Sequence, residues 1–190
     1  MTRRTRGREI ALQVLYQVEQ NPGTDPAVVR TFIERRLLRD KPLCDFAEAL
    51  VDGVREHRPR LDDLISGVAE NWKLDRMAAI DRNILRLGAY EMLYTSEVPF
   101  KVAINEALEL AKRYSTAQSS RFVNGILDRL QAAKVADAEG VTKPEPGAKP
   151  TPDAPAAPPG RTVGGLSERL QAARADAEAK AGTDAPADGG

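Results

Sequence analysis

The chain has 190 residues, a formal net charge of +0 at pH 7 and a single cysteine, Cys44. One cysteine excludes an intrachain disulfide, and no apolar run reaches the roughly 18–20 residues that a membrane-spanning helix requires. These totals exclude a disulfide-stabilised secreted domain and an integral membrane protein, and they predict a cytoplasmic protein with no membrane partner.

The zero net charge hides an uneven distribution. Residues 1–134 carry 22 Lys+Arg against 19 Asp+Glu, whereas residues 135–190 carry 6 against 9. The first eight residues contain four arginines and no acidic residue. Because phosphate binding depends on local charge more than on total charge, this N-terminal concentration favours a nucleic-acid partner.

Apolar residues at helical spacing, interrupted by Pro, Gly and Asn, predict seven helices. Asp25-Pro26 is typical of a helix start, because Asp caps free backbone N–H groups and Pro fits the first helical position. The fifth helix has apolar residues on more than one face, which indicates a central, largely buried position. The predicted helices cover about residues 5–19, 26–37, 43–57, 59–68, 75–94, 99–114 and 121–134, with a loop around Asn71 and Trp72.

No convincing alternating apolar–polar run extends over five residues, so no strand is predicted and the expected fold class is all-α. Residues 135–190 hold 8 of the 13 prolines and no aromatic residue. Such a segment buries too little apolar surface to offset chain entropy. We therefore expect one helical domain, residues 1–134, followed by a disordered tail rich in Pro, Ala and Gly. Within that tail, residues 169–174 repeat the Arg-Leu-Gln-Ala-Ala pattern that begins at Arg129.

Four arginines lead into the first helix and are candidates for RNA binding: Arg3, Arg4, Arg6 and Arg8. Guanidinium groups bind phosphates and guanine edges, so the segment is interpreted as an RNA-contacting arm, with a frayed, solvated terminus as the alternative. Tyr16 lies off the main apolar face. It is either a surface for base stacking or a half-buried core residue.

Arg121 and Phe122 are adjacent at the predicted start of the seventh helix, a pairing that suits a phosphate contact beside a stacked base. Phe122 is either a core residue or a stacking platform. Val123 and its neighbours at helical spacing already form an inward face, which favours partial exposure of the Phe122 ring. Asn124 either satisfies backbone groups at the helix end or reads a base edge.

No pattern of residues indicates catalysis. His57, the only histidine, lies near a helix C-terminus, where stabilisation by the helix dipole explains it without a catalytic role. Cys44 lies among core residues and is expected to be a small buried apolar group. The sequence shows no metal-ligand spacing, glycine-rich phosphate loop or Gly-x-Ser-x-Gly motif. The prediction is therefore a protein that is not an enzyme, with no catalytic residues, no metal site and no cofactor.

Four charged residues lie in the first part of the predicted fifth helix: Asp75, Arg76, Asp81 and Arg82. Charges of mixed sign on a helix are typical of a solvated face. They are equally compatible with a complementary rim for a protein partner.

Several segments match one known family in the same order. The most specific are Ile84–Glu91, Val98–Ala107 and Phe122–Asp128, and the arginine-rich start followed by Ala11–Tyr16 also fits. The chain resembles the NusB family of bacterial transcription antitermination factors. The resemblance covers about residues 3 to 133, nearly all of the predicted helical domain, and ordered matches in several segments are more specific than any single motif.

The resemblance implies seven helices in two packed sub-bundles and no enzymatic activity. NusB proteins bind the boxA element of nascent ribosomal RNA together with NusE, a small-subunit ribosomal protein. They join NusA, NusG and RNA polymerase to suppress premature termination. The resemblance implies that the RNA surface comprises Arg3, Arg4, Arg6, Arg8, Tyr16, Arg121 and Phe122, to which we add Asn124, and that the residues facing NusE are Asp75, Arg76 and Asp81.

The Pro/Ala-rich tail departs from the family pattern, which assigns it no role. An alternative function is a stand-alone RNA-targeting module related to the helical domain that precedes some ribosomal RNA cytosine methyltransferases. Such enzymes need a cofactor-binding α/β domain after the helical one, and residues 135–190 cannot supply it. A third interpretation is a helical scaffold whose arginine arm is incidental.

Overall fold

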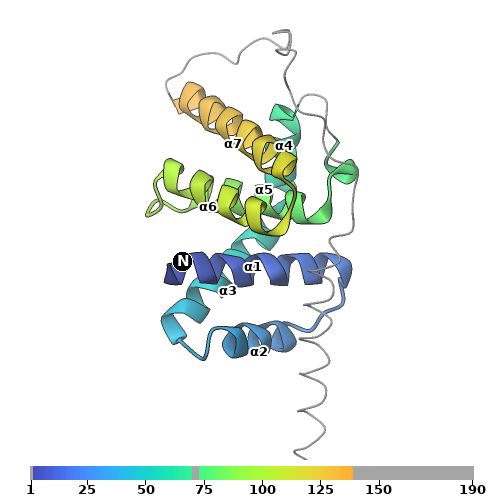
Figure 1. The fold of residues 1–190 in the computed structure, drawn as a ribbon, viewed down its shortest axis with the longest axis vertical. Coiled ribbons are helices and arrows are strands. Elements are labelled where there is room, and N and C mark those ends of the chain that lie inside the picture. The colour runs from blue at the N-terminus through green and yellow to red at the C-terminus, as the bar shows by residue number, and fades with distance from the viewer. Residues whose placement is uncertain (1, 70–72, 139–190) are drawn as a thin grey trace, which may run out of the picture.

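The structure, a computed structural model, describes residues 2–69 and 73–138. Within these residues the chain forms seven α-helices and one short 3-10 helix, with no β-strand (Figure 1). The predictions of an all-α fold and of seven helices are confirmed. The elements in chain order are α1 (Arg3–Gln20), α2 (Pro26–Arg36), α3 (Lys41–Glu56), α4 (Arg58–Val68), η1 (Leu74–Arg76), α5 (Ala79–Tyr94), α6 (Phe100–Tyr114) and α7 (Ala117–Ala138).

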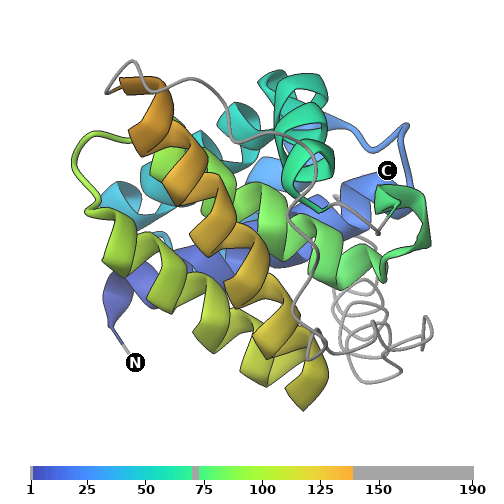
Figure 2. The same ribbon diagram turned by 90° about the horizontal axis from the view of Figure 1, so that it is seen from above.

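The helices form two packed sub-bundles (Figures 1 and 2). The first contains α1, α2 and α3, with α3 lying against both other helices. The second contains α4, α5, α6 and α7, and α5 contacts each of the other three. Because α5 also contacts α1 and α3, it joins the two sub-bundles, as its apolar pattern predicted.

The core of the molecule lies around α5. Ile80, Ile84, Leu85 and Leu87 are almost completely buried although they do not share one helical face. Burying each such side chain contributes about 1.5–3 kcal/mol to stability. Gly88 allows α6 and α7 to approach α5, because a Cβ added there would lie 3.2 Å from Ala107 and 3.0 Å from Leu127. The central helix is therefore held by contact on all sides.

A second close approach sets the position of α3. Gly7 of α1 faces the ring of Phe46 on α3, and a Cβ added at Gly7 would lie 2.8 Å from that ring. Two turns further along α3, the ring of Tyr90 from α5 covers Gly53. The two glycines let α3 pack closely against α1 and α5, and α3 in turn supports the beginning of α1.

α1 and α7 begin earlier than the sequence pattern predicted, and in both cases a threonine caps the helix. The Thr2 hydroxyl accepts a hydrogen bond from the Thr5 N–H at 3.1 Å, so α1 begins at Arg3. The Thr116 hydroxyl accepts the Ser119 N–H at 3.1 Å, so α7 begins at Ala117 and not after residue 120. The predicted arginine arm is thus part of a helix.

Two other boundaries also differ from the prediction. The predicted fifth helix is divided, because residues 75–76 belong to η1 and α5 begins only at Ala79. α7 continues to Ala138, beyond the helix end predicted near residue 134. The predicted loop at Asn71 and Trp72, the predicted disorder of the remaining tail and the repeat at residues 169–174 lie outside the described residues.

Candidate nucleic-acid interface

The first two turns of α1 place three arginines at one end of the molecule. Arg3 and Arg4 are exposed, and Arg6 is partly exposed. Arg3 pairs with Asp40, and Arg4 lies 5.5 Å from the centre of the Phe46 ring. Exposed ion pairs contribute little to stability, so an incoming phosphate can replace the carboxylate at small cost. The helix fixes the spacing of the Cα atoms that carry these side chains before any ligand binds.

Arg8, the fourth arginine of the predicted arm, is buried, with only 2% of the residue exposed. Its Nε and Nη2 donate hydrogen bonds to the carboxylate of Glu91 at 2.8 and 2.7 Å, and its Nη1 lies 3.6 Å from Glu106. The helical phase of α1 turns this position toward α5, where the bidentate pair links the two sub-bundles. The prediction that Arg8 belongs to an exposed RNA surface is therefore wrong.

A buried carboxylate beside this arginine cluster holds two basic side chains. Glu9 Oε2 lies 2.5 Å from Arg6 Nη1, and Glu9 Oε1 lies 3.3 Å from Arg113 Nη1 of α6. The Tyr114 hydroxyl also donates to Glu9. Burial alone would raise the pKa of Glu9, but the hydrogen bonds from Tyr114 and Arg6 and the charge of Arg6 outweigh it and hold that pKa below its ordinary value. Glu9 is therefore a stable anion that positions Arg6 and Arg113 side by side.

Tyr114 completes this network from inside the fold. Burial, together with its hydrogen bond to Glu9, raises the pKa of Tyr114 to about 12, so the phenol stays protonated at neutral pH. Its oxygen also accepts a hydrogen bond from the Gln13 amide at 3.3 Å. Because α1 and α6 share these contacts, the spacing between the arginines of the two helices is fixed.

Basic side chains continue from α1 onto the last turn of α6 and the beginning of α7. The Thr5 hydroxyl of α1 donates to Glu106 of α6 at 3.0 Å. The last turn of α6 carries Lys112 and Arg113. A short connection leads from there into α7, where Arg121 is exposed. Lys112 and Arg113 were missed because a basic pair in the last turn of a helix is usually explained by the helix dipole.

Phe122 is buried, with 9% of the residue exposed, and it belongs to the hydrophobic core. Its ring does not form the partly exposed platform that the sequence pattern favoured. The physical reason is the width of the inward face of α7. Phe122, Ile126 and Leu130 are four residues apart and form one edge of this face, while Val123 and Leu127 form the other.

Asn124 and Tyr16, the remaining predicted RNA-binding residues, are both partly buried. Asn124 lies inside α7, and its amide donates to the Asp128 carboxylate at 2.7 Å, so of the two alternatives left open by the sequence it does not satisfy backbone groups at a helix end. Tyr16 packs against the core, which is the half-buried arrangement left open by the sequence. Neither side chain is presented as an open stacking surface.

The residues predicted to face a protein partner divide into two groups. Asp75 and Arg76 are exposed on η1. Asp81 is only 3% exposed and accepts a hydrogen bond from the Ser119 hydroxyl at 2.9 Å, and burial raises the pKa of its carboxyl group although hydrogen bonds from Ser115 and Ser119 oppose the shift. Its predicted place on a solvated rim is wrong, because it joins the beginnings of α5 and α7 inside the fold.

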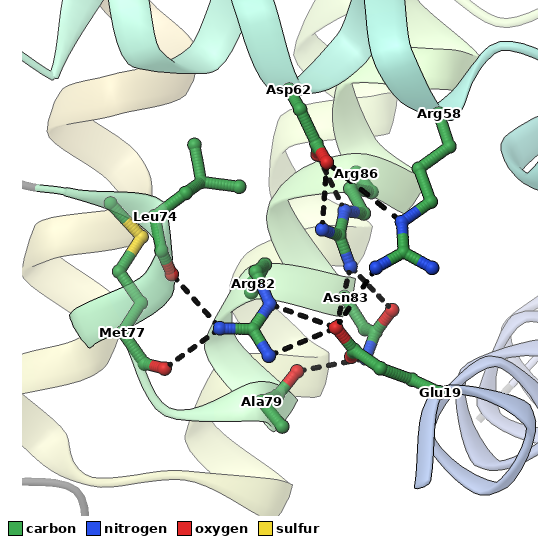
Figure 3. A network of polar contacts seen from close by, with 9 residues as sticks. All are labelled: Glu19, Arg58, Asp62, Leu74, Met77, Ala79, Arg82, Asn83 and Arg86. Atoms are coloured by element: carbon green, nitrogen blue, oxygen red, sulfur yellow. Dashed lines mark hydrogen bonds and ion pairs between the residues drawn. The ribbon is translucent and has the colours of Figure 1, made fainter. Parts of the chain in front are cut away.

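Arg82 is also not on a solvated face, because it belongs to an interior polar network (Figure 3). Glu19, at the end of α1, accepts hydrogen bonds from Arg82 at 3.0 Å and Arg86 at 3.1 Å, and it lies 3.4 Å from Arg58. Burial would raise the pKa of Glu19, but Arg86 and Arg82 outweigh it and lower that pKa. Arg86 also makes a bidentate pair with Asp62. The network joins α1, α4 and α5.

The same network positions η1. Arg82 Nη1 donates to the backbone carbonyls of Leu74 and Met77 at 2.9 and 3.2 Å. These two residues flank Asp75 and Arg76, so the exposed charges of η1 rest on a rigid support. The sequence shows the charged residues of this network but not which of them pair, because residues such as Glu19 and Arg82 are 63 positions apart.

The remaining residues of types that can act in catalysis or bind metal have structural roles in this fold. Cys44 is buried, as predicted, and burial raises the pKa of its thiol. The His57 ring stacks on Tyr94 with ring centres 4.0 Å apart. Over residues 2–69 and 73–138, no group of three or more His, Cys, Asp or Glu side chains is arranged to hold a metal ion. Over the same ranges, no helix is long and apolar enough to cross a bilayer.

The fold and this surface define a class: a helical protein of two sub-bundles with a cationic face made by α1, α6 and α7. The model of the NusB family matches residues 5–132, and the chain belongs to the NusB family. A transcription antitermination protein NusB from Anaeromyxobacter sp. (strain Fw109-5) is 50% identical over 136 residues, which cover 68% of this chain and 90% of that protein. The resemblance noted in the sequence is confirmed.

Two solved structures have the same fold. T. maritima NusB matches with a TM-score of 0.62 and 40% identity, covering 70% of this chain and 92% of that one. Antitermination factors NusB and NusE in complex with dsRNA match with a TM-score of 0.63 and 26% identity, covering 70% of this chain and 98% of the matched one. Membership of a family of transcription factors also confirms the prediction that the chain is not an enzyme.

Proposed function

We propose that this protein is a transcription antitermination factor that binds the boxA element of nascent ribosomal RNA together with NusE. Membership of the NusB family supports the proposal, as does the solved complex of a family member with NusE and dsRNA. The observation that carries it is the row of basic side chains that begins with Arg3, Arg4 and Arg6 and continues through Arg113. The spacing of Arg6 and Arg113 is fixed by Glu9, so this part of the surface is preorganised.

The proposed RNA surface consists of Arg3, Arg4, Arg6, Arg113 and Arg121. Each guanidinium that contacts a phosphate displaces condensed counterions, so each steepens the fall of log K with log salt by about 0.7 for single-stranded RNA. Tyr16 and Asn124 contribute at most at the edge of this surface, since both are partly buried. Arg8 and Phe122 are buried beneath this surface and contribute indirectly, because their contacts hold α1 and α7 in place.

The proposed contact with NusE lies on η1, at the other end of α1. Asp75 and Arg76 are exposed there and supported by Arg82, which makes η1 a rigid, mixed-charge surface suited to a protein partner. In this proposal, NusE bound at η1 also contacts the RNA, so each partner raises the affinity of the protein for the other by the same factor. In this proposal the assembly joins NusA, NusG and RNA polymerase in the cytoplasm and allows the polymerase to read through terminators.

The test is a binding series with boxA RNA and a scrambled RNA of equal length and composition, each with and without purified NusE. We expect boxA RNA to bind more tightly than scrambled RNA and NusE to increase that difference. Asp75→Ala combined with Arg76→Ala is expected to remove the effect of NusE and to leave the affinity for RNA alone unchanged. Equal affinity for the two RNAs under all conditions would refute the proposal.

The alternative, an RNA-targeting module for a methyltransferase, requires a different partner. It predicts RNA binding that is insensitive to NusE and a catalytic chain that associates with this protein. The solved complex of a family member with NusE favours the antitermination factor. A NusE-dependent gain in boxA affinity separates the two functions directly.

A further inference from the structure

The connection between α2 and α3 has an unusual backbone for its sequence. Leu38 and Arg39 have φ values of 54° and 56°, the left-handed region that favours glycine. The Arg39 N–H donates to the Glu34 carbonyl at 2.8 Å, and the Leu38 N–H donates to the Arg35 carbonyl at 3.4 Å. These two bonds are those of a Schellman motif, which normally ends a helix with glycine where Leu38 stands.

Leu38 gains nothing within the fold that would offset this strain. It is 90% exposed, the most exposed of the large hydrophobic residues in the described part of the chain. A leucine in the left-handed region carries steric strain that glycine avoids, and an exposed leucine recovers none of it through burial. Strained backbone with no structural benefit is a sign of a contact made with another molecule.

Positive charge surrounds Leu38. Residues 35–41 contain four basic residues and one acidic residue. Arg35 and Arg39 are exposed, and no carboxylate within residues 2–69 and 73–138 forms an ion pair with either. Arg36 is exposed as well and lies 5.9 Å from the centre of the Phe32 ring. The α2–α3 corner, defined here as Arg35, Arg36, Leu38 and Arg39, therefore carries three exposed arginines within three residues of one exposed leucine.

The α2–α3 corner adjoins the arginine cluster of α1. Asp40, the residue directly after Arg39, pairs with Arg3. Figure 1 shows the corner and the beginning of α1 on the same side of the molecule. The cationic surface of α1 therefore continues across Arg3 onto the connection between α2 and α3.

We propose that the α2–α3 corner is a second RNA contact, which holds nucleotides of the transcript that lie beyond those bound by α1 and α6. The arginines take the phosphates, and Leu38 packs against an unstacked base or a ribose. Planar guanidinium groups match phosphate oxygens in pairs, which is why arginine suits this role better than lysine. The inference rests on the proposed function, because the corner is useful only if the adjacent surface holds RNA.

The experiment compares two RNAs: boxA alone, and boxA extended at either end by about ten nucleotides, a length comparable to one single-strand binding site. Arg35→Ala combined with Arg39→Ala removes two charges from the corner. Arg55→Ala combined with Arg60→Ala is the matched control, since these exposed arginines lie at and beyond the far end of α3. We expect the corner variant to bind one extended RNA roughly tenfold more weakly and boxA alone with unchanged affinity. The control variant is expected to match the wild type on both.

Any of four results would overturn the inference. The corner variant could bind every extended RNA as the wild type does. It could lose affinity equally for the short and the extended RNAs, or to the same degree as the control. It could lose affinity for NusE and not for RNA, which would make the corner a protein contact. If the wild type itself shows no preference for boxA RNA, the proposed function fails together with the inference.

Leu38→Gly separates a binding role from a structural one. Glycine relieves the left-handed strain, so the melting temperature is expected to stay the same or to rise. Affinity for the extended RNA is expected to fall even though the fold is intact. Unchanged affinity in a variant of equal or higher stability would remove Leu38 from the proposed contact.

Discussion

The buried pair of Arg8 and Glu91 provides a demanding test of which arginines bind RNA. Arg8→Met removes the positive charge and leaves Glu91 buried without its bidentate partner. Breaking a buried ion pair from one side costs about 3–5 kcal/mol. With an unfolding entropy of about 2.1 cal/mol/K per residue, this lowers the melting temperature of the described domain by about 10–18 °C. Thermal unfolding followed by circular dichroism measures the shift.

The double variant Arg8→Met with Glu91→Leu removes both charges from the interior. Replacing a buried ion pair with apolar side chains of similar volume is often neutral, so we expect most of the lost stability to return. Glu106 retains its hydrogen bond from Thr5 in this variant. Because Arg8 does not reach the surface, the folded double variant is expected to bind boxA RNA as the wild type does. A single variant of wild-type stability, or a stable double variant that loses RNA binding, would refute the reasoning.

Three further predictions concern Glu19, Phe122 and residues 139–190. The lowered pKa of Glu19 means that its ionised form stabilises the fold above about pH 4.5 and that this stabilisation is lost as the pH falls through the lower folded value. Glu19→Gln should therefore be less stable than the wild type at pH 7, by about 1–3 kcal/mol in chemical denaturation. This difference in the free energy of unfolding should become smaller below pH 4.5. A difference that does not change with pH would contradict a stabilising role for the ionised Glu19. Phe122→Leu should cost about 1–2 kcal/mol and leave RNA affinity unchanged in a filter-binding assay, whereas a large loss of affinity would restore the stacking role. Removal of residues 139–190 should change neither the melting temperature nor boxA binding, and a clear fall in either would show that the tail has a role in the domain.

The sequence predicts this fold well because the helices are defined by local signals. Apolar spacing gave seven helices, and the Asp25-Pro26 pair gave the beginning of α2, where the Asp25 carboxylate caps the Ala27 N–H at 2.8 Å. The central position of α5 followed from apolar residues on several of its faces. These signals act within a few residues of each other, so reading them requires no tertiary information.

The largest errors in the predicted site concern charged residues whose partners are distant in sequence. Arg8 is buried only because Glu91, 83 positions away, meets it across the two sub-bundles. Asp81 is buried because Ser119, 38 positions away, lies beside it. A charged residue in a helical pattern is normally assigned to the surface, and only the tertiary fold shows that an interior partner is present. The same limit hid Arg113, whose position beside Arg6 depends on Glu9.

The most direct test of the RNA surface is the salt dependence of boxA binding by Arg3→Ala combined with Arg4→Ala. Both residues are exposed, and the matched control is Arg55→Ala combined with Arg60→Ala. If the arginines of α1 contact two phosphates, the slope of log K against log salt becomes shallower by about 1.4 in the variant. Its affinity for RNA is then below that of the wild type at every salt concentration lower than the one at which the two lines meet. A slope equal to that of the wild type and of the control would contradict the assignment of RNA binding to the beginning of α1.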